Sequence, residues 1–165
     1  MLSTSRLFSA ILFLALFVMS TREIADPDFW WHLRTGQYIV ETGTVPHADI
    51  YSFTNADKPW IAHEWLSEVL IYAIYRVGGF PALILTFSLI ITLAFAFVYS
   101  QCAGKPYLAS FVLLLTALAT APTWGVRPQM ISMLLTSVFL FVLDKSVIAR
   151  SKATKQSPNS GNWKL

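Results

Sequence analysis

FPALILTFSLIITLAFAFVYS, residues 80–100, is an almost wholly apolar run without a charged residue. Its length matches the roughly 20 residues that an α-helix needs to cross the hydrocarbon core of a bilayer. The composition of the whole chain agrees, because 55% of its 165 residues are hydrophobic and 13% are charged, whereas soluble domains average about 25% charged residues. The sequence therefore predicts an all-α integral membrane protein.

Three further apolar runs lie outside this segment, at residues 4–20, 107–124 and 130–147. With residues 80–100 they predict a helical bundle of about four transmembrane helices, a membrane domain that occupies residues 1–147. The remaining residues, 148–165, are basic and rich in serine, and we expect them to form a disordered tail.

The first apolar run also has features of a signal peptide, because Arg6 precedes it. The sequence at residues 20–23, Ser-Thr-Arg-Glu, is a poor cleavage site, which favours an uncleaved helix. Basic residues then set the expected orientation. Arg6, Lys105 and the basic tail fall on one side of four spans, so we expect both termini in the cytoplasm.

The connection at residues 22–79 is then an external loop, and it carries eight of the nine acidic residues of the chain. Asp26-Pro27 resembles a helix N-cap followed by proline at the first helical position, and Thr42-Gly43 a helix end. Residues 62–77 predict a second short helix, which ends at the Gly-Gly-Phe-Pro sequence of residues 78–81. Both helices are expected to lie at the membrane interface.

Asp26 and Asp28 are the first candidates for chemistry, because paired carboxylates bind divalent cations or remove a proton from a hydroxyl. Capping of a helix N-terminus would select the same residues. His32 lies four residues after Asp28 and could share a metal ion or a proton with it, although a polar helix face towards water or headgroups is the simpler interpretation. Arg127 suits a lipid phosphate or the role of a surface arginine at the interface.

The remaining histidine, glutamate, cysteine and basic residues give weaker indications of function. His63-Glu64 begins like the zinc-protease helix motif, but Ser67 replaces the second histidine, so this interpretation is rejected. Glu64 and Glu68 predict a solvated helix face. Cys102 is the only cysteine, which excludes an internal disulfide. A nucleic-acid partner is not expected, since the basic residues form no patch interleaved with aromatic residues.

The stretch from residue 26 to 43, DPDFWWHLRTGQYIVETG, resembles the first external loop of membrane glycosyltransferases of the GT-C fold, and its D-x-D and following arginine are similar to the motif of oligosaccharyltransferase catalytic subunits. Further segments resemble uncharacterised bacterial members of that superfamily: VP at 45–46, YSFT at 51–54, PW at 59–60, HEWLSE at 63–68 and RPQ at 127–129. The resemblance covers roughly residues 4–143.

The resemblance implies a transferase that moves a sugar from a polyprenyl-phosphate carrier to an acceptor at the external face. It implies that Asp28 is the acid that binds a divalent cation (Mg²⁺ or Mn²⁺) or activates the acceptor, with Asp26 as its neighbour. Arg127 is expected to contact the carrier phosphate, and His32 and Arg34 to bind substrate. The expected partners are membrane lipid and the polyprenyl-linked donor.

The chain also departs from that family, whose members have several hundred residues and many more spans. The tail from Val147 to Ser157 resembles translated dispersed repeats of bacterial genomes, so we expect an N-terminal part of a truncated reading frame. The main alternative is a catalytically inactive membrane protein, either a remnant or a small assembly subunit. A transporter fragment ranks last, because the predicted spans hold almost no ionisable residues.

Overall fold

The computed structural model describes residues 3–56, 58–102 and 104–156, and these residues form helices and loops without a strand. The helices are α1 (Thr4–Ser20), α2 (Phe29–Thr42), α3 (Trp65–Ser100), α4 (Pro106–Thr120), the 3₁₀ turn η1 (Ala121–Thr123) and α5 (Pro128–Gln156). The all-helical class predicted from the sequence is therefore confirmed for the described part of the chain.

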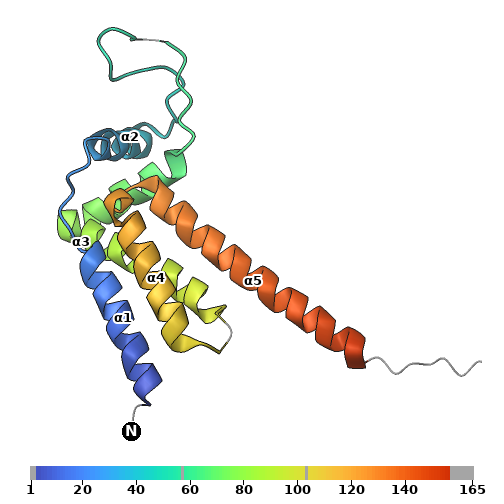
Figure 1. Cartoon of the computed structure of the whole chain (residues 1–165). Helices are drawn as coiled ribbons and strands as arrows, with labels where there is room; N and C mark the ends of the chain where they lie inside the picture. The colour runs from blue at the N-terminus through green and yellow to red at the C-terminus, as the bar shows by residue number, and fades with distance from the viewer. Residues whose placement is uncertain (1–2, 57, 103, 157–165) are drawn as a thin grey trace, which may run out of the picture.

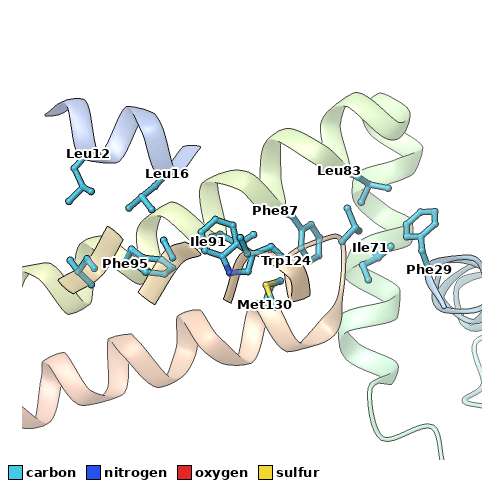
Figure 2. Close-up of a cluster of buried hydrophobic side chains, with 14 residues drawn as sticks. Leu12, Leu16, Phe29, Ile71, Leu83, Phe87, Ile91, Phe95, Trp124 and Met130 are labelled. Carbon is cyan, nitrogen blue, oxygen red and sulfur yellow. The ribbon is translucent and has the colours of Figure 1, made fainter. Parts of the chain in front are cut away.

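Among the described residues, one apolar core takes side chains from all six helical elements, α1 to α5 and η1 (Figure 2). Leu16 from α1 packs there with Phe87 and Ile91 from α3 and with Trp124, which stands between η1 and α5. Two polar contacts add to the packing of α1 on α3: the hydroxyl groups of Ser9 and Tyr99 lie 2.7 Å apart. Thr21 donates to Ser88 over 3.3 Å.

Within the described residues, three helical segments are long and apolar enough to cross a membrane: Trp65–Ser100, Pro106–Thr123 and Pro128–Ile148. The predicted first span coincides with α1, which is apolar but has only 17 residues. A helix of that length is about 26 Å long, slightly below the roughly 30 Å of a hydrocarbon core. The structure thus supports three spans by length and leaves α1 as a shorter fourth candidate.

A break inside α3 occurs where the sequence predicts one. Gly78 and Gly79 have non-helical backbone angles, and Gly79 has φ 63° and ψ −154°, a region that is essentially restricted to glycine. The segment after the break, residues 80–100, is about 32 Å long and fits a single membrane crossing. The segment before it, residues 65–77, is the predicted second helix of the long loop.

Helix α2 lies across one end of the bundle, and the loop of residues 43–64 extends beyond it (Figure 1). The helix ends at Gly43, which has φ 69°, so the predicted stop at Thr42-Gly43 is confirmed. The predicted start was wrong, because the helix begins at Phe29 and Asp28 occupies the N-cap position. In the loop, an isolated bridge joins Ala48 to Pro59.

Helix α5 runs along the second half of α3, where the rings of Phe97 and Phe141 lie 5.4 Å apart between centroids, but little of its apolar length is buried. It continues to Gln156. The prediction of a disordered tail from residue 148 was therefore wrong for residues 148–156, which are helical, and residues 157–165 lie outside the described residues. At the end of α3 that is remote from α2, Cys102 is exposed in the link to α4.

Candidate functional site

Helix α2 crosses the first segment of α3 at very short range. A Cβ atom added at Gly36 would lie 2.1 Å from the backbone oxygen of Glu68 and 2.9 Å from the Cβ of Tyr72. Only glycine permits this approach of two backbones, since a real Cβ cannot stand so close to a carbonyl oxygen. Phe29, His32, Thr35 and Ile39 are buried on the same side of α2. The crossing therefore positions every side chain of α2 that faces α3.

Asp26 and Arg127 form an ion pair through Asp26 Oδ2 and Arg127 Nε. The pair links the segment between α1 and α2 to the start of α5. The side chain of Asp26 is 11% exposed and that of Arg127 is 36% exposed. Both groups were expected at the same end of the bundle, and their contact confirms this. The role of Arg127 as a phosphate ligand stays a prediction.

The charge state of this pair follows from its contacts. Burial raises the pKa of Asp26, but hydrogen bonds from Arg127 and from the backbone N–H of Asp28 outweigh burial, so that the pKa lies below its ordinary value of 3.8. The hydrogen bond to Asp26 raises the pKa of Arg127. Both groups are therefore charged at neutral pH.

Asp28 is exposed, and its side chain makes no capping hydrogen bond. Its backbone N–H donates to Asp26 Oδ1 over 3.1 Å. The Asp26 carboxylate is thus used by Arg127 and this backbone group, and the helix cap predicted for Asp26 was wrong. Asp28 is left as the accessible carboxylate of the Asp-Pro-Asp sequence, which is the property that a base or a metal ligand requires.

His32 does not lie on a polar face with Asp28, and that interpretation was wrong. Its imidazole is 3% exposed, and its Nδ1 lies 3.1 Å from Glu68 Oε1 and 3.6 Å from Glu64 Oε2. The indole ring of Trp31 covers it at 3.8 Å between ring centroids. His32 is a buried partner of two carboxylates from the start of α3.

The solvated face predicted for Glu64 and Glu68 was also wrong. Glu68 is completely buried, and the side chain of Glu64 is 20% exposed. Together with His32 they form a group whose potential ligand atoms all lie within 4.8 Å of one another. Among the described residues, it is the one group of three or more residues that could hold a metal ion. Asp28 is outside this set.

Arg34 lies on the exposed side of α2 and donates from Nη1 to Gln37 over 2.8 Å. Its predicted contact with substrate stays a prediction.

A pocket of about 320 Å³ lies beside the Asp26–Arg127 pair. Its lining includes Arg22, Glu23, Pro27, Trp124 and both members of the pair. Arg22 donates to the carbonyl oxygens of Ala121 and Met19, which holds a second guanidinium at this pocket.

Two residues of this region were not identified from the sequence, although a signal for each was present. Glu68 precedes the apolar Ile71 by three positions, a spacing that places both on one face of a helix, and both are completely buried. Gly36 is an isolated glycine inside a helical pattern four residues after His32, which indicates a close backbone approach.

Comparisons give no independent assignment of these residues, because no family model, no curated protein and no solved structure matches this chain.

Proposed function

We propose that this chain is a multi-pass protein of the bacterial inner membrane and part of a transferase that moves a sugar from a polyprenyl-phosphate carrier to an acceptor at the external face. Four spans, formed by α1, residues 80–100, α4 with η1, and α5, would place both termini in the cytoplasm and the acidic loop outside. The resemblance of residues 26–43 to the first external loop of GT-C transferases supports this function.

One observation carries the proposal: the Asp26–Arg127 ion pair beside a pocket that also holds the charged side chains of Arg22 and Glu23, at the end of an apolar bundle. A carrier lipid with its chain along the apolar helices would present its phosphate at such an end. Arg127 has five N–H donors, of which one carboxylate uses at most two. Donors of Arg127, with the guanidinium of Arg22 on the same lining, would remain for the phosphate.

Asp28 is the residue that we assign to the chemical step. Its exposed carboxylate would accept the proton of the acceptor hydroxyl, while the acceptor oxygen bonds to the anomeric carbon. The bond between that carbon and the phosphate oxygen breaks in the same step, and the carrier leaves as polyprenyl phosphate. A divalent cation, where one is used, would supply charge neutralisation at the phosphate. The described residues gather no third ligand around Asp28, so no step is assigned to an ion there.

Replacement of Asp28 by asparagine is expected to lower sugar transfer by at least about 100-fold, because a general base contributes about 10² to 10⁴ in rate. The measurement is transfer of a labelled sugar from a polyprenyl-phosphate donor by membranes that contain equal amounts of each variant. Glu41→Gln, a carboxylate change at an exposed position at the end of α2, is the matched control and should retain full transfer. Equal transfer by wild type and Asp28→Asn would remove Asp28 from the mechanism.

The alternative, an inactive membrane protein, is favoured by one observation. The Asp26 carboxylate is already paired with Arg127, as expected of a contact that only joins two loops. In that case wild-type membranes transfer no more labelled sugar than membranes without the protein, and the Asp26→Asn substitution changes stability alone.

A further inference from the structure

The strongest unexplained feature of the molecule is the group formed by His32 of α2 and by Glu64 and Glu68 at the start of α3. Two carboxylates face one imidazole nitrogen in a region where Glu68 is completely buried. Glu68 Oε1 is 3.1 Å from His32 Nδ1. Glu68 Oε2 is buried and has no hydrogen-bond partner among the described residues.

The charges of this group do not balance. Buried ionised carboxylates are costly unless they are paired and hydrogen-bonded. Even a protonated His32 would leave one negative charge on two carboxylates. The other ionisable side chain that contacts this group among the described residues is His63, which is 76% exposed and whose Nε2 stands 3.8 Å from Glu64 Oε1. A divalent cation would compensate both carboxylates, and a rotation of the Glu68 carboxylate would let its unpartnered Oε2 serve as the ligand atom.

The distances suit a metal site. Two ligands that are each about 2.1 Å from a metal ion, at angles between 90° and 110°, lie about 3.0–3.4 Å apart. His32 Nδ1 lies 3.1 Å from Glu68 Oε1 and 3.6 Å from Glu64 Oε2, and all three ligand atoms lie within 4.8 Å of one another, so side-chain rotations can bring them around one ion. Three protein ligands also leave a coordination position open, as in catalytic metal sites.

We propose that His32, Glu64 and Glu68 bind a divalent transition-metal ion through the imidazole Nδ1 and one oxygen of each carboxylate. One imidazole and two carboxylates favour Zn²⁺ or Mn²⁺ over Mg²⁺ and Ca²⁺, which prefer oxygen ligands alone. The partial exposure of Glu64 provides the path by which the ion enters. This site is separate from Asp28, and it does not depend on sugar transfer.

The test uses the purified full-length chain in detergent, stripped of metal and then loaded with Mn²⁺ or Zn²⁺. After gel filtration we expect one bound equivalent of metal per chain. Glu64→Gln is expected to weaken the affinity by at least about 100-fold, since it removes one ligand of three and one of two negative charges. Glu41→Gln and Asp28→Asn should bind like the wild type. Normal binding by Glu64→Gln, or loss of binding in Asp28→Asn, would overturn the assignment.

A second measurement needs no variant and therefore does not depend on whether a variant folds. Pulsed electron paramagnetic resonance of the Mn²⁺-loaded wild type should show a ¹⁴N coupling from one imidazole nitrogen. A site formed by Asp26 and Asp28 would show none. Folded wild-type protein that retains no metal, or Mn²⁺ without a nitrogen coupling, would show that His32 and the two glutamates form only a hydrogen-bonded cluster.

Discussion

Replacement of Gly36 by alanine is expected to destabilise the protein, although alanine is the better helix former by about 1 kcal/mol. The new Cβ would meet the backbone oxygen of Glu68 at 2.1 Å, and a backbone cannot move aside as the end of a flexible side chain can. Overpacking of this kind costs about 1–3 kcal/mol, and more where backbone is involved. The measurement is unfolding of the purified protein in mixed micelles, followed by circular dichroism.

Gly125→Ala is the matched control, because a Cβ at Gly125 would have no heavy atom within 4 Å. It should change the free energy of unfolding by a few tenths of a kcal/mol at most. A Gly36→Ala protein as stable as the wild type would show that α2 and α3 do not pack at this distance. The same substitution should also weaken metal binding, since it moves His32 away from Glu68.

The second large effect is expected at the Asp26–Arg127 pair. Removal of one partner from a fully buried ion pair costs about 3–5 kcal/mol. Because the side chain of Arg127 is 36% exposed, solvent screening reduces the expected loss for Arg127→Gln to about 1–2 kcal/mol at neutral pH. A double-mutant cycle with Asp26→Asn should show coupling, because both single changes break the same contact.

The pH dependence gives an independent check of this pair. The folded-state pKa of Asp26 lies below the ordinary value of 3.8, so its stabilisation is fully present above pH 3.8 and is lost as the pH falls through the folded pKa. The stability difference between wild type and Arg127→Gln should therefore be largest near neutral pH and shrink in acid. A difference that is constant with pH would exclude an electrostatic origin.

Features that depend on neighbouring residues could be predicted from the sequence. The membrane-length helix at residues 80–100 follows from the length of the apolar sequence. The break at Gly78-Gly79 and the helix end at Gly43 follow from the φ angles that glycine can adopt. The position of Asp26 and Arg127 at one end of the bundle was also expected from the alternation of spans, but their ion pair was not.

The burial of Glu68 was signalled only by its spacing from the apolar Ile71, which does not show that another helix will cover that face. Glutamates four residues apart at the start of a helix are usually solvated, and nothing local in residues 64–68 indicates which side α2 will cover. The docking of α2 at Gly36 decides it, and this is a contact between distant parts of the chain. The start of α2 was also missed: Asp26 Oδ1 does accept the backbone N–H of Asp28, but the helix itself begins only at Phe29.

The position of the chain's single cysteine provides a direct report of membrane topology. Cys102 is exposed in the link between α3 and α4, at the end of the bundle remote from α2. In the proposed four-span topology, a thiol reagent that cannot cross membranes therefore samples the compartment opposite to that of Asp28 and Arg127. Labelling of Cys102 only after cells are permeabilised would place the acidic loop in the periplasm, and labelling of intact cells would place it in the cytosol.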